Sequence, residues 1–160
     1  MTLDKKKALT TLLELSKTAH ERELSEEELA KMNEILEASD GLDELLGARY
    51  DKVAPQEIVM KLRIEAKHLQ PWGVTNGGVY ASLGETAASM ASYIAAGAGP
   101  IVMGTNNNTD FLRPSRQGDT IISSATPEHL GRSAHLWRVE HRNERTGKLL
   151  ALTSLKTAVM

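Results

Sequence analysis

Residues 68–97 read HLQPWGVTNGGVYASLGETAASMASYIAAG, and this stretch decides the fold. Its second half contains many alanines together with leucine and methionine, all of which favour helix. Asn76 with the glycine pair that follows it, and Gly97 behind, are typical of helix ends. The stretch therefore predicts one helix over about residues 78–96, which is roughly 30 Å long at ~1.5 Å per residue.

Glu85 is the only charged side chain between residues 69 and 109. No face of the predicted helix is polar enough for a surface helix, so we expect the helix to be buried. Burying a lone carboxylate is costly, and Glu85 must therefore be partnered, protonated or functional. The simplest structural alternative is a glutamate paired with a buried arginine or with backbone.

The chain before this stretch predicts helices first and then a strand. Apolar residues at helical spacing predict one amphipathic helix within residues 1–22. A second helix begins after Ser25, which forms a capping box with Glu28, and ends by Gly41. A short third turn of helix follows. Residues 58–66 then alternate between apolar and polar side chains, which predicts a half-buried strand.

The chain after the helix predicts only strands joined by short turns. The expected strands cover residues 101–111, 120–126, 133–142 and 149–159. Three asparagines at 106–108 disfavour strand and indicate a bulge or a site within the first of them. Because the links have hairpin length, we expect a largely antiparallel sheet. Neither GxGxxG nor GxxxxGK[ST] occurs, which argues against dinucleotide-binding and P-loop folds.

Composition excludes several classes of function. A net charge of −2, the lack of a long Lys/Arg block and only six aromatic residues argue against nucleic-acid binding. The chain has no cysteine, so we expect no disulfide, no thiolate nucleophile and a cytoplasmic location. The central helix contains several serines and one glutamate, and we therefore expect a soluble protein rather than a membrane span.

Part of the central stretch resembles a known family. It consists of Gln70-Pro71-Trp72-Gly73-Val74-Thr75-Asn76-Gly77-Gly78, followed by Leu83, Glu85 and Thr86. These residues resemble the PaaI-like and 4-hydroxybenzoyl-CoA thioesterases, in which Gln-Pro-x-Gly-x-x-His-Gly-Gly precedes a Leu-x-Glu-Thr helix. Asn76 stands where the family usually has histidine. Two later segments also look like the family: Asn108 with Phe111-Leu112-Arg113-Pro114, and His129-Leu130-Gly131-Arg132.

The resemblance covers residues 42–160 and implies the hotdog fold. In this α+β fold an antiparallel sheet wraps around one long central helix, which agrees with the predicted order of elements. The first forty residues are not explained by the likeness. We therefore expect an N-terminal helical extension over residues 1–45 and a hotdog thioesterase domain over residues 46–160.

The same resemblance implies an acyl-CoA thioesterase, which hydrolyses a CoA thioester to the free acid and CoA. Glu85 is the expected nucleophile or general base, because an apolar site can raise the pKa of a carboxyl towards the useful range. The backbone N–H of Gly77 at the helix start is the expected oxyanion donor. A thiol with a pKa near ~8.5 leaves without strong acid help.

Three further side chains are candidates for the catalytic site. Gln70 matches the family residue that holds the thioester carbonyl or the water. Asn76 is either a second donor to the carbonyl or simply the cap of the helix. Ser89 lies four residues after Glu85 on the same helix face, where it either binds the attacking water or serves close helix packing.

The resemblance also indicates residues for the CoA phosphates and an assembly. These residues are Arg132 after Gly131, and also Arg113 and Arg116, since arginine makes forked contacts with phosphate. We expect no bound cofactor and no metal, because His135 and His141 would lie ~20 Å apart on one strand. Family members imply a homodimer or homotetramer with active sites shared between subunits.

Two other functions stay open at this point. One is a non-catalytic acyl-CoA-binding hotdog protein, which the Asn76 departure motivates. The other is a hotdog acyl-CoA hydratase or dehydratase. The sequence does not reveal the acyl group, because that depends on the shape of the pocket.

Overall fold

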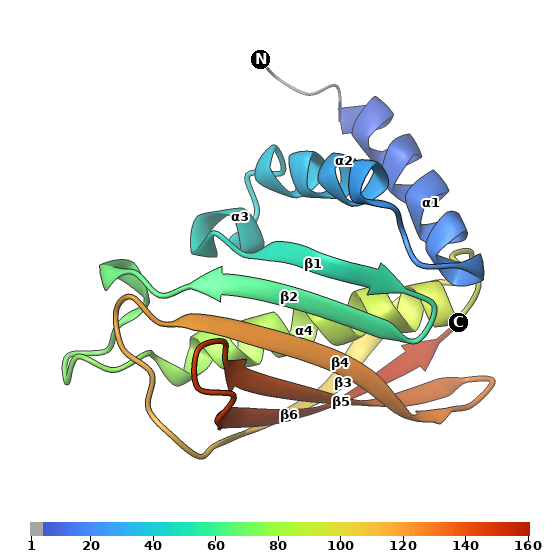
Figure 1. Ribbon diagram of the computed structural model, residues 1–160. Helices are drawn as coiled ribbons and strands as arrows, with labels where there is room; N and C mark the ends of the chain where they lie inside the picture. Colours follow the sequence, from blue (N-terminus) through green and yellow to red (C-terminus); the bar gives the residue numbers. More distant parts are fainter. Residues whose placement is uncertain (1–4) are drawn as a thin grey trace.

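The computed structural model describes residues 5–160 and contains four α-helices, one 3₁₀ turn and six strands. The elements are α1 (Lys5–Glu21), α2 (Glu26–Glu37), α3 (Leu42–Leu46), β1 (Arg49–Ala54), β2 (Glu57–Arg63), η1 (Ala66–His68), α4 (Gly77–Ala95), β3 (Val102–Phe111), β4 (Thr120–Leu130), β5 (Ala134–Asn143) and β6 (Leu149–Val159). Figure 1 shows the long helix α4 running along the strands, with the N-terminal helices at one side of the sheet.

The six strands form one sheet in the order β1-β2-β4-β5-β6-β3, and every neighbouring pair is antiparallel. α4 lies along one face of this sheet and contacts all strands from β2 to β3 (Figure 1). The predicted α+β class, with an antiparallel sheet around one long helix, is therefore confirmed. Within the described chain no helix has both the length and the apolar character needed to cross a membrane.

The core lies between α4 and the sheet. Leu83 and Ile94 of α4 are fully buried, as are Trp137 and Leu155 of the sheet. Burial of each such side chain contributes about 1.5–3 kcal/mol. Gly84 packs so closely on β6 that a Cβ there would lie 2.7 Å from Thr153 Oγ1. The small residues of α4 thus let the helix approach the sheet.

The prediction that α4 is buried holds for the face against the sheet but not for the opposite face. The outward face of α4 carries Ser82, Glu85, Thr86 and Ser89, and all four are only partly buried. The sheet covers one side of the helix, and the helical extension covers only part of the other. Glu85 therefore keeps access to solvent, and its charge does not carry the full cost of burial.

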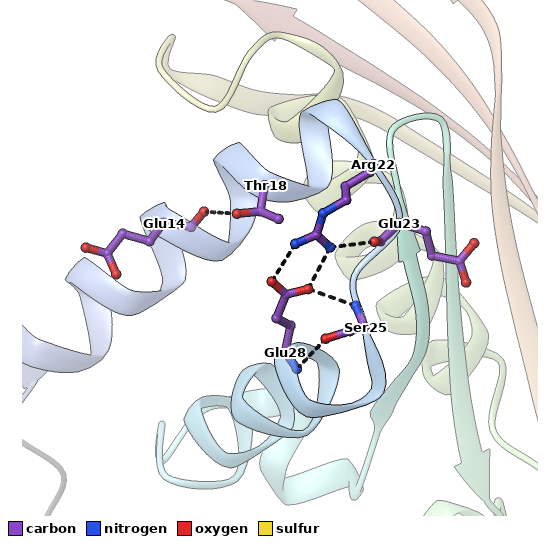
Figure 2. Close-up of polar contacts among 6 residues, drawn as sticks. All are labelled: Glu14, Thr18, Arg22, Glu23, Ser25 and Glu28. Carbon is purple, nitrogen blue, oxygen red and sulfur yellow. Dashed lines mark hydrogen bonds and ion pairs between the residues drawn. The ribbon is translucent and has the colours of Figure 1, made fainter.

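The N-terminal helices begin and end close to where the sequence predicted. Figure 2 shows the capping box: Ser25 Oγ accepts from the Glu28 N–H at 3.3 Å, and Glu28 Oε2 accepts from the Ser25 N–H at 2.8 Å. The Arg22 guanidinium donates to both oxygens of Glu28 and lowers the pKa of that carboxyl. α2 packs on β1, and α1 packs on α4 and β1.

β1 was not predicted. Only Tyr50, Val53 and Ala54 of this strand are buried, while Arg49, Asp51 and Lys52 interrupt the apolar pattern. The strand forms because it pairs with β2 through a tight hairpin. At the opposite edge, the pairing register of β3 shifts between Gly104 and Asn106. This irregularity precedes the asparagines at 106–108, which pair regularly with β6 although the sequence predicted that they disfavour strand.

Candidate active site

At the start of α4, the side chain of Asn76 caps the helix, and the backbone amide of Gly77 is free in the part of the chain that the structure describes. Asn76 Oδ1 accepts a hydrogen bond from the Gly78 N–H at 2.8 Å, so Asn76 is the N-cap. The Gly77 N–H has no acceptor anywhere in residues 5–160. It points from a helix N-terminus, where the backbone dipoles favour negative charge. This amide is therefore available to an incoming anion.

Gly77 borders a cleft of about 410 Å³. The cleft is lined by Gln70, Val74, Thr75, Gly77, Tyr80, Phe111, Leu112, Arg113 and Pro114. A Cβ on Gly77 would lie 2.6 Å from Phe111 Cζ, so glycine is needed for the close approach of this ring. Phe111 is 61% exposed and forms part of the cleft wall at the surface.

Gln70 belongs to the same cleft through a tight turn. Its N–H donates to the carbonyl of Val74, and its own carbonyl accepts from the Gly73 N–H, both at 2.9 Å. Gly73 has a φ of 74°, a conformation that favours glycine. The turn therefore brings Gln70 and Gly77, two of the expected catalytic residues, to one cleft.

Glu85 is held by neutral donors. Ser89 Oγ donates to Glu85 Oε1 and Asn107 Nδ2 donates to Oε2, both at 3.2 Å. No lysine, arginine or histidine of the described chain forms an ion pair with this carboxylate. Gly104 makes room for it, because a Cβ at that position would overlap Oε1. The carboxylate is oriented, but its charge is not neutralised.

Asn107 is itself oriented by the neighbouring residues of β3 and α4. Its Oδ1 accepts from Thr109 Oγ1 at 2.9 Å, and its Nδ2 also donates to the carbonyl of Ala81 at 3.1 Å. An amide nitrogen only donates and an amide oxygen only accepts. These contacts therefore fix the amide with its nitrogen towards Glu85.

The chain of hydrogen bonds continues from Thr109 into the core. Thr109 Oγ1 contacts Thr153 Oγ1 at 2.8 Å, Thr153 contacts His141 Nε2 at 2.9 Å, and His141 Nδ1 contacts Ser123 Oγ at 2.8 Å. Burial lowers the pKa of His141 to about 3, so the ring is neutral. The Thr109 hydroxyl donates to Asn107, so it must accept from the Thr153 hydroxyl. Thr153 in turn must accept from His141. His141 therefore carries its proton on Nε2.

Glu85 and Gly77 do not form one site within a single chain. They are eight residues apart on α4, so their Cα atoms are separated by ~12 Å along the helix axis. A thioester carbonyl is only a few ångströms across. One chain therefore holds the carboxylate and the free amide in two separate places.

Ser89 connects Glu85 to a second cavity of about 430 Å³. The walls come from α1, α2, β1 and α4 and are mostly apolar: Leu12, Met32, Ile35, Leu36, Tyr50, Met90 and Tyr93. At one side, Asp43 Oδ1 accepts from Thr86 Oγ1 at 2.8 Å, and burial raises the pKa of Asp43. Ser89 thus lines this mostly apolar cavity and also donates to the carboxylate of Glu85, which itself is not part of the cavity wall.

The four residues expected to bind CoA phosphates lie in two places. Arg113 lines the cleft at Gly77, and Arg116 lines a neighbouring cleft that Arg113 also borders. Gly131 and Arg132 lie in the turn between β4 and β5, at the far end of the sheet from the start of α4 (Figure 1). The structure therefore places Arg113 and Arg116 near the cleft at Gly77, whereas Gly131 and Arg132 lie far from it.

Several residues of this site were not predicted individually. The asparagine run at 106–108 did indicate a site, but it did not single out Asn107. Nothing in the sequence linked Thr109, Thr153 and His141, which lie on three different strands. No group of three or more potential metal ligands occurs in the part of the chain that the structure describes.

Comparison with known proteins identifies the family. A model of the thioesterase superfamily matches residues 73–150. The proofreading thioesterase EntH of Cronobacter turicensis is 32% identical over 119 residues, which cover 74% of this chain and 85% of that protein. A solved thioesterase of Haemophilus influenzae superposes with a TM-score of 0.75 at 30% identity, over 82% of this chain and 90% of that one.

A second structure leads to the same family. The phenylacetic acid degradation protein PaaI of Thermus thermophilus, solved as a mutant, superposes with a TM-score of 0.69 at 30% identity. The match covers 76% of this chain and all of that one. The two solved structures share the fold with this chain over most of its length. The chain therefore belongs to the thioesterase superfamily, with the hotdog fold.

Proposed function

We propose that this protein is an acyl-CoA thioesterase with Glu85 as its reactive carboxylate. The observation that carries the proposal is a partly open carboxylate held by two neutral donors beside an apolar cavity. The membership of the thioesterase superfamily supports thioester hydrolysis in general. The acyl group then lies in the cavity lined by Met32, Met90 and Tyr93.

Glu85 acts in one of two ways. As a general base it takes a proton from a water molecule, whose oxygen attacks the carbonyl carbon. As a nucleophile it attacks the carbon itself, and water then hydrolyses the resulting anhydride. In both cases the C–S bond breaks and the sulfur leaves as the thiol of CoA, with the acid as the other product. Gln70 helps to hold the carbonyl or the water.

The oxyanion donor comes from a second copy of the chain. Gly77 of the same chain is ~12 Å away from Glu85 along the helix, so it cannot serve the same carbonyl. β3 is an edge strand whose second side is unpaired, and Met103 and Phe111 on it are exposed. Antiparallel pairing of β3 with its counterpart would build a dimer with shared sites. Arg132 contacts a CoA bound at Gly77 only in such an assembly.

Replacing Glu85 by glutamine tests the proposal. Glu85→Gln keeps both hydrogen-bond partners near an isosteric side chain but removes the base or nucleophile, and the rate of thiol release should fall ~10²–10⁴-fold. Release from a panel of acyl-CoA esters is followed with a thiol reagent. Glu14→Gln on α1 is the control for a lost charge. Wild-type turnover by a folded Glu85→Gln protein would exclude Glu85 from the mechanism.

A second candidate is a non-catalytic acyl-CoA-binding protein. It is favoured by Asn76, whose Oδ1 serves as the helix cap where relatives of this family usually have histidine. Calorimetry with an acyl-CoA ester would then record binding while no free thiol appears. The thiol assay on the wild-type protein separates this candidate from the enzyme.

A further inference from the structure

A third cleft, of about 310 Å³, is lined by four positively charged side chains. It lies between the loop at 113–119 and the turn at 143–148, and its cations are Arg113, Arg116, Arg145 and Lys148. All four side chains are exposed. None of them forms an ion pair within residues 5–160. Four cations thus face one hollow without an ion-pair partner in this range, and Arg113 Nη1 donates to the carbonyl of Leu149 at 2.9 Å.

The turn that presents Arg145 and Lys148 has a fixed shape. The Asn143 N–H donates to the carbonyl of Lys148, and Asn143 Oδ1 accepts from the Thr146 N–H, both at 3.0 Å. Arg142 Nη1 donates to the carbonyl of Gly147 at 2.9 Å. The backbone positions of the two cations are therefore set before any ligand binds.

The loop that presents Arg113 and Arg116 is tied to the start of α4. Ser115 is buried, and its Oγ contacts Thr75 Oγ1 and Tyr80 Oη, both at 2.6 Å. The Thr75 N–H also donates to the carbonyl of Ser115 at 2.9 Å. These bonds hold the loop to the segment that carries the free Gly77 amide.

The charged cleft continues into the cleft at Gly77. Arg113 and Pro114 line both of them. One carboxylate, Asp119, borders the charged cleft, and its Oδ2 already accepts from the Arg116 N–H at 2.9 Å. A long ligand with one end at Gly77 would therefore pass Arg113 and finish among the other cations.

We infer that this cleft binds the phosphate groups of CoA and that Arg145 and Lys148 are part of the binding site. The inference rests on the proposed function and extends it to two residues that no sequence motif indicates. Guanidinium groups bind phosphate through paired hydrogen bonds, and an ammonium adds a point charge. The thioester at one end of the ligand then lies at Gly77, and the nucleotide lies across the 143–148 turn.

The test compares two thioesters that share an acyl group. One is the CoA ester, and the other is the pantetheine ester, which ends before the phosphates. In R145A/K148A the ratio of KM for the CoA ester to KM for the pantetheine ester should rise about tenfold, since two charge-assisted contacts at an exposed site are lost. The control K7A/K17A removes two exposed α1 lysines and should keep the wild-type ratio.

Each outcome bears on the inference. An equal rise of both KM values, or an unchanged ratio in R145A/K148A, would overturn it. If the wild-type protein hydrolyses neither ester, the proposed function fails, and CoA itself is titrated by calorimetry. A weaker affinity for CoA in R145A/K148A than in K7A/K17A would then still support the phosphate site, and equal affinities would exclude it.

Discussion

Glu85 and Gly77 lie on the same helix, but the carboxylate of Glu85 has hydrogen-bond partners and the amide of Gly77 has none in the described chain. Around Glu85 each neighbour has a partner: Ser89 and Asn107 donate to the carboxylate, and Thr109 fixes Asn107. At Gly77 the amide has no partner in the described chain. The first region holds an existing negative charge in one orientation. The second is ready to receive a negative charge that appears only during a reaction.

Removing the Gly77 donor should have the largest effect. Gly77 is the first residue of α4, where proline is tolerated, and the extended backbone of Asn76 suits a residue before proline. Gly77→Pro therefore deletes the N–H and leaves the helix intact. Relative to Gly77→Ala, which keeps the N–H and also meets Phe111, kcat should fall ~10²–10³-fold. Thiol release at saturating acyl-CoA measures the difference.

Mixing two inactive variants sharpens this comparison. If Glu85 and Gly77 of different copies share a site, then a mixed dimer of Glu85→Gln and Gly77→Pro chains contains one intact site. Co-expression of the two should recover about a quarter of wild-type activity, because half of the dimers are mixed and each has one site of two. No recovery in a verified mixed dimer would contradict shared sites.

A charge placed beside Glu85 should have an intermediate effect. Asn107→Asp replaces the donor by a carboxylate of the same shape, so in the variant a like charge lies beside the Glu85 carboxylate. The acidic limb of the pH profile of kcat/KM should move to higher pH, and kcat at neutral pH should fall about tenfold. Asn106→Asp, the next residue along β3, is the control. A pH profile that does not move would show that Asn107 leaves the carboxylate unaffected.

The smallest effect is expected at the buried end of the hydrogen-bond chain. His141 has a pKa of about 3 in the folded protein, below its usual value, so the unfolded chain binds one more proton between about pH 3 and 6.5. The contribution of His141 to the free energy of unfolding is complete above pH 6.5. Below pH 6.5 the free energy of unfolding falls by up to ~1.4 kcal/mol for each pH unit. Urea unfolding of wild type and His141→Gln from pH 7 to 4.5 should give a flatter pH dependence for the variant.

The sequence predicted the parts of the fold that depend on local pattern. The position of α4, the capping box at Ser25 and the last strand follow from periodicity and end signals. β1 was missed because its charged residues hide the alternation, and it is stabilised by pairing with β2. That Glu85 is partly exposed could not be predicted either, since periodicity does not tell which side of a helix a sheet will cover.

In the candidate site, too, the residues in a local motif were predicted, and the contacts that depend on tertiary structure were not. Gln70, Gly77 and Glu85 were predicted from a motif that is continuous in sequence. The links from Asn107 to His141 depend on the register between β3, β6 and β5, and the charged cleft depends on two distant turns meeting. Such arrangements arise from tertiary structure and leave little trace in a single sequence.

The unpaired edge of β3 has one more consequence. The strand that would recognise another copy is also the strand that carries Asn107, so separation of the copies would loosen the residue that orients the carboxylate. Specific activity should then decline on dilution in step with the fraction of separated chains, because each proposed site needs Gly77 of one copy and Glu85 of another. Association and catalysis would thus be coupled through a single strand.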